Sequence, residues 1–531
     1  MTPESRPREP AKKGSGTTRW ASPAAGAVSG ILFALAFPPV EWVVLLPLAL
    51  VPWIVALRSE ESRARALLSG VLFGLAFWCA SIPWIFYVVT HYGGQSAGLG
   101  VASLVLLAAI LSQWPALVAW GVVASGAPGS PRRLLLFPLL WMASEHARSF
   151  VYGGFPWNLT AHALYRHPLW TQSASIAGVF GLAGITAAIS ACLAEAIAAR
   201  RLRPLLGAAL LVFAAGAWGA GRLASAPRGG PELPVTLLQP NRTEEMRSTP
   251  EGARETYRSV IAQAQRAAED LPVLIVIPES ALPAYWDRSL AMRQDLATIA
   301  GQGPMILFND VQEDADGRAF NVARLLTRRG IAGPSYRKVH LVPFGEYVPL
   351  PRVFFFVRQI SREIGEFAAA QEPVLLRSDP FAIGVGICYE IIYPSLARLE
   401  VANGANLLAT ISNDSWYGRA GAQEQHFAGA VLRSVENERY LVRAAITGIS
   451  GIVDERGRIR AEAGPDRKAT LSGSVRLESN LTAWTRWGFW ISRVADVLAA
   501  GVLLFGLARL ARPSSRRNAE SRERTADRLL T

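Results

Sequence analysis

Long apolar runs alternate with short charged loops over the first 224 residues of this 531-residue chain. A helix that crosses a bilayer needs about 20 predominantly apolar residues. The pattern therefore predicts about eight membrane-spanning helices, the first two of them somewhat short, near 20–37, 42–57, 66–89, 97–124, 133–150, 171–199, 204–221 and 488–508.

The region between the seventh and eighth runs has a different pattern. Short apolar runs alternate there with charges and turn residues, which is typical of a water-soluble domain. We therefore expect a tail at 1–19, a membrane domain of seven helices at 20–224, a soluble domain at 225–485, a last transmembrane helix at 486–511 and a second tail at 512–531.

The composition agrees with a membrane protein. Hydrophobic residues make up 51% of the chain and charged residues only 18%, and the mean hydropathy is +0.23, which is too apolar for an ordinary soluble enzyme of this length. A net charge of +13 could indicate nucleic-acid binding. We interpret it as topology instead, because much of the basic excess lies in the tails and in loops on one side of the predicted spans.

The basic residues orient the chain. By the positive-inside rule, the side that carries the tails and the loops at 58–65, 132–133 and 200–203 is cytoplasmic. The soluble domain then faces outward, on the periplasmic side of a bacterial inner membrane. The first apolar run could also be a cleaved signal peptide. The second run follows almost at once, however, so we interpret the first as a retained anchor.

Three strand-like runs in the soluble region end on reactive side chains. LPVLIVIPES presents Glu279, SYRKVHLVPFGEYVP presents Lys338 and then Glu346, and FAIGVGICYE presents Cys388. Chemistry in open α/β sheets is usually built just past the strand ends. A thiol with a pKa of about 8.5 needs a base to become a nucleophile, and an ammonium can stabilise the oxyanion that follows. Glu279 and Lys338 suit these tasks.

Plainer interpretations of these residues remain. Cys388 could be a small core residue, Glu279 a helix N-terminal carboxylate, and Lys338 a surface cation. Only four of the 54 Lys and Arg residues are lysines, so a lysine in an apolar context favours a functional role. Cys79 and Cys192 lie inside apolar runs, so we do not expect a disulfide at Cys388.

The set PESALP, YRKVHLVPFGEYVP, GICYE and NDSWYG resembles the carbon–nitrogen hydrolase (nitrilase) superfamily. HLVPFGEYVP in a multi-span frame is similar to its apolipoprotein N-acyltransferase family. GFPW at 154–157, QPNR at 239–242 and QH at 425–426 also fit. The resemblance implies a four-layer αββα sandwich and a Glu-Lys-Cys triad of Glu279, Lys338 and Cys388, without a metal or another cofactor.

The same resemblance suggests supporting residues. Glu346 matches a second glutamate near the triad, and Tyr389, Glu390 and Trp416 match positions that line and shape the site. Glu390 could equally be a structural hydrogen-bond acceptor, and Trp416 could be plain packing. The family commonly has an asparagine where Ile446 stands here, so a polar contact at that position is in doubt.

The resemblance also implies a reaction. Cys388 would take an acyl chain from a membrane phospholipid, typically phosphatidylethanolamine, and pass it to the α-amine of diacylglyceryl-cysteine at the N-terminus of a lipoprotein. A tethered amidase that releases acid to water, and a lipid-binding scaffold or transporter without activity, are the alternatives. The complete triad disfavours the scaffold or transporter, and eight spans are more than a tether needs.

Two stretches resemble membrane-interface segments. VFFFV at 353–357 could be an arm that dips into lipid, or it could fill the domain core. Trp484, Trp487 and Trp490 at the start of the last span are typical of an aromatic belt. Arg493 and Asp496, three residues apart in that helix, are predicted to neutralise one another.

Overall fold

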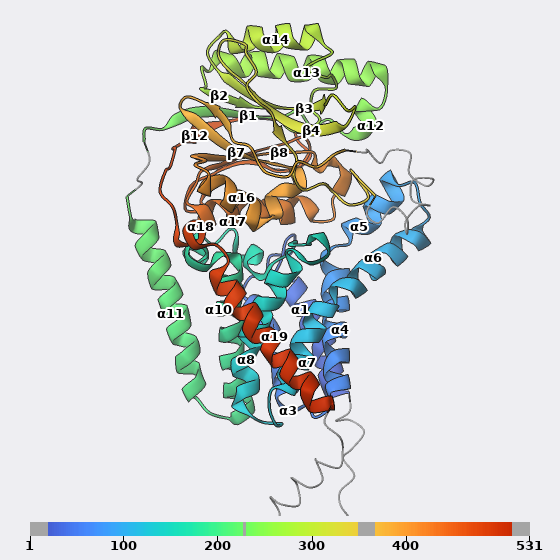
Figure 1. The fold of residues 1–531 in the computed structure, drawn as a ribbon, viewed down its shortest axis with the longest axis vertical. Coiled ribbons are helices and arrows are strands. Elements are labelled where there is room, and N and C mark those ends of the chain that lie inside the picture. The colour runs from blue at the N-terminus through green and yellow to red at the C-terminus, as the bar shows by residue number, and fades with distance from the viewer. Residues whose placement is uncertain (1–19, 227–229, 349–366, 512–531) are drawn as a thin grey trace, which may run out of the picture.

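The computed structural model describes residues 20–226, 230–348 and 367–511. A bundle of helices forms one end of the molecule, and an α/β domain is stacked on the other end (Figure 1). The predicted combination of a multi-span helical region and an αββα sandwich is confirmed. The VFFFV segment lies outside the described residues.

All eight predicted apolar runs contain helices. Five helices of the described chain are long and apolar enough to cross a membrane: Arg63–Ser81, Ala97–Ala124, Ala174–Ala199, Arg203–Ala224 and Trp490–Arg509. The helices Ala21–Ala34 and Leu45–Ser59 are shorter. The bundle comprises α1 (Ala21–Ala34), α2 (Leu45–Ala49), α3 (Val51–Ser59), α4 (Arg63–Ser81), α5 (Trp84–Tyr87), α6 (Ala97–Leu111), α7 (Gln113–Ala124), α8 (Pro131–Arg148), α9 (Pro168–Thr171), α10 (Ala174–Ala199), α11 (Arg203–Ala224), α18 (Ala483–Trp487) and α19 (Trp490–Ala511).

Helix α8 differs from the other predicted spans because it buries charged side chains. Arg133 donates to the backbone carbonyls of Leu57, Arg58 and Glu60. Near the other end of α8, Glu145 accepts from the backbone N–H of Thr160 at 2.9 Å. Hydrogen bonds with backbone groups reduce the cost of burying these charges.

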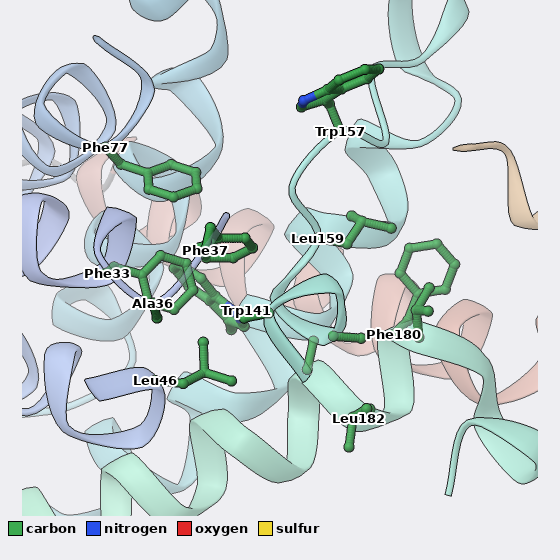
Figure 2. Packing of buried hydrophobic residues seen from close by; sticks show 14 of the residues in the cluster. Phe33, Ala36, Phe37, Leu46, Phe77, Trp141, Trp157, Leu159, Phe180 and Leu182 are labelled. Atoms are coloured by element: carbon green, nitrogen blue, oxygen red, sulfur yellow. The ribbon is translucent and has the colours of Figure 1, made fainter. Parts of the chain in front are cut away.

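Small residues and aromatic rings together pack the bundle. A Cβ atom on Gly26 or Gly30 of α1 would lie 2.2 Å or 2.3 Å from a backbone oxygen of α4, so only glycine allows this approach. Beside this contact the rings of Phe33, Phe37 and Trp141 form an edge-to-face cluster (Figure 2). Close helix packing and ring contacts therefore build the interior of the bundle.

The arginine-rich loops gather at the end of the bundle that lies away from the α/β domain (Figure 1). Arg58 at the end of α3 pairs with Glu195 of α10 at 2.9 Å. The backbone N–H of Gly129, in the loop before α8, donates to the carbonyl of Arg58. The loops that the positive-inside rule assigns to one side therefore share one end of the bundle.

The start of α19 partly differs from its prediction. Trp484 is fully buried, whereas Trp487 and Trp490 are exposed. Asp496 pairs with His146 of α8 at 2.7 Å and not with Arg493. The predicted pair within one helix is therefore wrong, because a partner from a neighbouring helix takes the carboxylate.

The α/β domain contains two six-stranded sheets, with the orders β12-β1-β2-β3-β4-β5 and β11-β10-β9-β8-β7-β6. The three strands β1, β2 and β3 are parallel to one another, as are β7, β8 and β9, and the flanking pairs are antiparallel. The strands are β1 (Leu233–Gln239), β2 (Leu274–Val276), β3 (Met305–Glu313), β4 (Ala319–Leu326), β5 (Tyr336–Arg337), β6 (Leu376–Ser378), β7 (Phe381–Ile387), β8 (Leu407–Ser412), β9 (Leu441–Ala445), β10 (Ser450–Val453), β11 (Ile459–Ala463) and β12 (Ala469–Val475).

Two helical layers cover the sheets. Helices α13 (Pro250–Glu269) and α14 (Leu290–Ala300) cover the sheet far from the bundle, with the short α12 (Glu244–Arg247) nearby, while α16 (Pro394–Ala402) and α17 (Ala422–Asn437) lie between the other sheet and the bundle (Figure 1). Every residue of α17 except Glu424 is buried, whereas α13 buries one face only. The inner helical layer is therefore where the domain and the bundle meet.

Candidate active site

The three predicted strand ends converge between the two sheets. Glu279 follows β2 and is buried, and its Oε1 lies 3.7 Å from Nζ of Lys338, which follows β5. Its Oε2 accepts from the backbone N–H of Asn413, which follows β8. We call the sheet far from the bundle (β12-β1-β2-β3-β4-β5) the outer sheet and the other the inner sheet. The carboxylate of Glu279 therefore contacts an ammonium of its own outer sheet and a backbone donor of the inner sheet.

Burial and charge act in opposite directions on these groups. Burial raises the pKa of Glu279, Lys338 lowers it and Glu346 raises it, and the net shift is upward. For Lys338, burial lowers the pKa, but Glu346 and Glu279 outweigh burial and raise it. The lysine therefore stays an ammonium, and the glutamate is a stronger base than a free carboxylate.

Glu346 completes a small network around the ammonium. Its Oε1 accepts from Nζ of Lys338 at 2.9 Å, and its Oε2 accepts from the backbone N–H of Val342. Asn321 on β4 donates through Nδ2 to Oε1 of Glu279 at 2.9 Å and to Oε1 of Glu346 at 3.0 Å. Asn309 on β3 donates in turn to the side-chain oxygen of Asn321. One amide thus holds two carboxylates beside one ammonium.

Cys388 begins a short 3-10 helix directly after β7. Its φ is +52°, in the left-handed region that non-glycine residues seldom adopt, and its side chain is 5% exposed. Burial raises the pKa of the thiol, Glu279 raises it further, and Lys338 partly opposes the shift. The resting thiol is therefore protonated, and it lies within electrostatic reach of a base and a cation.

Glu390 is fully buried and accepts four hydrogen bonds. Oε1 accepts from the backbone N–H groups of Val339 and His340, and Oε2 accepts from the N–H of Ile387 and the hydroxyl of Tyr336. Burial raises its pKa to about 7, although these bonds and Lys338 oppose the rise. Glu390 thus ties the segment that carries Lys338 to the turn that carries Cys388, which is the hydrogen-bond role weighed above.

The aromatic candidates contact the bundle. The ring of Tyr389 stacks on Trp157 with centroids 6.4 Å apart, and Trp416 lies 4.8 Å from Tyr92. Tyr92 ends the π-helix Val88–Tyr92, and its hydroxyl donates to the carbonyl of Ser415. The turn after Cys388 and the NDSWYG loop therefore both face the helices.

Asn321 was not a sequence candidate. Its only signal is a polar side chain in the otherwise apolar run FNVA. Asp414, His426 and Arg443 were also missed; they form a buried cluster behind Cys388, and the motifs NDSWYG and QH contain two of them. Ile446, where the family commonly has an asparagine, packs in the apolar cluster of the outer sheet.

Among the described residues, no group of three or more His, Cys, Asp or Glu side chains could hold a metal ion. Cys79, Cys192 and Cys388 are all free thiols. The candidate site brings together a thiol, a carboxylate of raised pKa and a buried ammonium.

Comparison with known proteins identifies the family. Residues 29–192 match the family model for the apolipoprotein N-acyltransferase N-terminal domain, and residues 235–484 match the carbon–nitrogen hydrolase model. The chain is 35% identical over 503 residues to the apolipoprotein N-acyltransferase of Geobacter metallireducens, covering 90% of this chain and 94% of the relative. It is 32% identical to that of Methylococcus capsulatus, covering 93% and 96% of the two chains. The α/β domain has the carbon–nitrogen hydrolase fold, and the chain therefore belongs to the apolipoprotein N-acyltransferase family.

Proposed function

We propose that this protein transfers an acyl chain from a membrane phospholipid to the N-terminal α-amine of diacylglyceryl-cysteine on apolipoproteins. Cys388 is the nucleophile, Glu279 the general base and Lys338 the cation that stabilises the oxyanion. The observation that carries the proposal is the buried thiol of Cys388 at a left-handed turn, beside a carboxylate and an ammonium that approach each other to 3.7 Å.

The first half of the reaction loads the enzyme. Glu279 takes the proton of the thiol as sulfur attacks the ester carbonyl of the phospholipid, and Lys338 stabilises the negative charge on the carbonyl oxygen. The carbon–oxygen ester bond then breaks. The lysophospholipid alkoxide leaves with the proton from Glu279, and a thioester remains on Cys388.

The second half passes the acyl chain on. The free amine of the acceptor attacks the thioester carbonyl and gives its proton to Glu279. The carbon–sulfur bond breaks, an amide forms, and the thiolate takes the proton back. The raised pKa of Glu279 supports both proton transfers, because a base works best when its pKa approaches the operating pH.

The position of the site supports lipid substrates. The turn after Cys388 and the NDSWYG loop contact the helices through Trp157 and Tyr92. Moving an acyl chain out of a membrane costs about 0.8 kcal/mol per CH₂, so a site against the bundle avoids much of that cost. Phosphatidylethanolamine is the donor we expect.

We infer that the α/β domain faces the periplasm from the inner membrane. The arginine-rich loops lie at the opposite end of the bundle, and the positive-inside rule places such loops in the cytoplasm. Single cysteines in the 231–260 region of an otherwise thiol-free protein should react with an impermeant maleimide that reaches the periplasm. Cysteines at 58–65 should not react, and the reverse pattern would contradict this orientation.

Mass spectrometry of the purified protein after incubation with phosphatidylethanolamine tests the proposal. We expect the mass of one acyl chain on the peptide that contains Cys388, removable by hydroxylamine as a thioester is. The Cys388→Ala variant should gain no such mass. An acyl chain on another residue, or turnover without any acyl-enzyme, would contradict the proposal.

A further inference from the structure

A fully buried polar cluster lies directly behind the candidate nucleophile. Asp414, His426 and Arg443 are each inaccessible to solvent. His426 contacts the turn itself, since its Nε2 lies 2.9 Å from the backbone carbonyl oxygen of Cys388. The catalytic steps above use none of these three residues.

The hydrogen bonds define which ring nitrogen carries the proton. A carbonyl oxygen only accepts, so Nε2 of His426 must carry the hydrogen that it shares with Cys388. Nδ1 has two charged neighbours: a guanidinium nitrogen of Arg443 lies 3.1 Å from it, and Oδ1 of Asp414 lies 3.0 Å from it. Burial and Arg443 lower the pKa of His426, Asp414 partly opposes the shift, and the net direction favours a neutral ring. In the neutral ring the hydrogen is therefore on Nε2, where it bonds the nucleophile's backbone.

Asp414 holds the arginine in place. Its Oδ2 lies 2.6 Å from the same guanidinium nitrogen of Arg443, and its Oδ1 accepts from the hydroxyl of Ser412 at 2.6 Å. The guanidinium also donates to the carbonyl of Ile449. The position of His426 is therefore fixed by residues of the inner sheet and of the loop after it.

The residue beside His426 connects to the membrane bundle. The side-chain oxygen of Gln425 accepts from the indole N–H of Trp157 at 2.6 Å and from that of Trp84 at 3.3 Å. Its amide nitrogen donates to the carbonyls of Pro38 and Ser81. All four partners belong to the helical part of the chain. Of two consecutive residues of α17, Gln425 therefore contacts the bundle and His426 contacts the nucleophile.

The backbone of Cys388 needs such support. A non-glycine residue in the left-handed region persists only where its surroundings hold it there. Glu390 holds the preceding residue through the N–H of Ile387, and His426 holds Cys388 itself through the carbonyl. Loss of either bond would free the turn to relax and move the sulfur.

We propose that His426 is a positioning residue for Cys388. Its Nε2 donates to the carbonyl of Cys388, Arg443 and Asp414 hold the Nδ1 side of the ring, and Gln425 makes its position depend on the packing of the helix bundle. The proposal rests on the proposed role of Cys388 as nucleophile. It assigns the bundle a part in catalysis beyond anchoring.

Two substitutions separate the two sides of the ring. The amide nitrogen of His426→Gln can reach the place of Nε2 and keep the bond to Cys388. The shorter His426→Asn can reach only the place of Nδ1, so it can contact Arg443 but not the Cys388 carbonyl. We expect His426→Asn to slow acyl-enzyme formation about tenfold to hundredfold, the loss that a small misplacement of a reacting group causes, with KM for phosphatidylethanolamine unchanged. His426→Gln should keep most of the rate.

The readouts are single-turnover acylation by mass spectrometry, iodoacetamide alkylation of Cys388 in a Cys79→Ala/Cys192→Ala background, and thermal unfolding. His162 is a matched control, because it is equally buried and makes no hydrogen bond with described residues. We expect His162→Asn to acylate at the parent rate. Equal rates for the asparagine and glutamine variants at position 426, or a loss at position 162 as large as that of His426→Asn, would overturn the proposal.

Gln425→Leu tests the link to the bundle and does not depend on whether the variants at position 426 fold. It leaves His426 in place and removes four contacts with the helical part. We expect slower alkylation and slower acylation of Cys388, and parent rates in a folded protein would overturn the link. Failure of the proposed function would look different, because Cys388→Ala would then keep its activity.

Discussion

The two halves of the α/β domain have the same strand pairing but different surroundings. In each, three parallel strands are flanked by antiparallel ones, and a left-handed residue with a φ of +52° follows the first parallel strand: Asn241 after β1 and Cys388 after β7. The outer half is covered by α13, which keeps a polar face, and the inner half by α17, which is buried almost throughout. The left-handed residue that follows the first parallel strand is thus an asparagine in the outer half and a cysteine in the half that faces the bundle.

The proposed catalytic residues come from both halves. The outer half supplies Glu279, Lys338 and Asn321, and the inner half supplies Cys388 and Glu390. Hydrogen bonds from Asn413 to Glu279 and from Tyr336 to Glu390 join them. The proposed site therefore exists only where both halves meet, so substitutions in either half should disable it, by amounts that depend on the role of the residue.

The largest effect should come from the inner half. Cys388→Ala removes the only proposed nucleophile, and we expect acyl transfer to fall by about 10⁴-fold or more in a phospholipid-to-peptide assay. Cys79→Ala and Cys192→Ala are matched controls, since both are free thiols in the bundle, and they should keep nearly full activity. Substantial turnover by the Cys388 variant would remove the inner half from the chemistry.

Glu279→Gln tests the outer half with little change in shape. The amide can keep one hydrogen-bonding oxygen but cannot take the thiol proton, so acyl-enzyme formation should fall about 10²- to 10⁴-fold. Acylation should recover partly at high pH, where the thiol ionises without help. If the variant has the parent's pH–rate profile, another base activates the thiol.

Lys338→Arg asks whether charge alone is enough. A planar guanidinium cannot occupy the site of an ammonium that lies between two carboxylates, so we expect a loss of about 10²- to 10³-fold in kcat. Lys468→Arg is the control, because Lys468 is exposed and its ammonium donates to the hydroxyl of Ser259. A Lys338→Arg enzyme as fast as the control would exclude Lys338 from the catalytic set.

Asn321→Leu should have a smaller effect. It leaves both glutamates without one donor, and an unsatisfied buried group costs about 1–3 kcal/mol, so activity should fall roughly tenfold to hundredfold. Single-turnover acylation measures it. Unchanged activity would show that Lys338 alone keeps the two carboxylates in place.

The smallest expected effect is the dependence on pH. Glu390 must be ionised to accept four donors, and its pKa of about 7 lies above that of a free glutamate, so protonation begins near neutral pH as the solution is acidified. Acylation at pH 6 should be about tenfold slower than its plateau, the fraction expected one unit below such a pKa. A flat profile down to pH 5 would contradict the role of an ionised Glu390.

Local sequence patterns predict the fold class and the strand ends because both arise from short-range periodicity. Glu279 and Cys388 each follow an apolar run directly, and Lys338 follows the short strand β5. Partners supplied by distant segments are not predictable in this way. In the sequence Asn321 is one polar residue in a strand, and only the fold brings Glu279 and Glu346 within hydrogen-bond distance of it. Likewise, Asp496 pairs with His146 of another helix and not with Arg493, which is close in sequence.

The central claim is that the acyl chain passes from Cys388 to an amine. The direct measurement is to isolate the acylated protein, remove free phospholipid, and add a diacylglyceryl-cysteine peptide while mass spectrometry follows both species. We predict that the acyl mass leaves Cys388 and appears on the peptide in equal amount, and that an N-acetylated peptide receives none. Release of free fatty acid at the same rate with either peptide would contradict the account and identify the protein as a hydrolase.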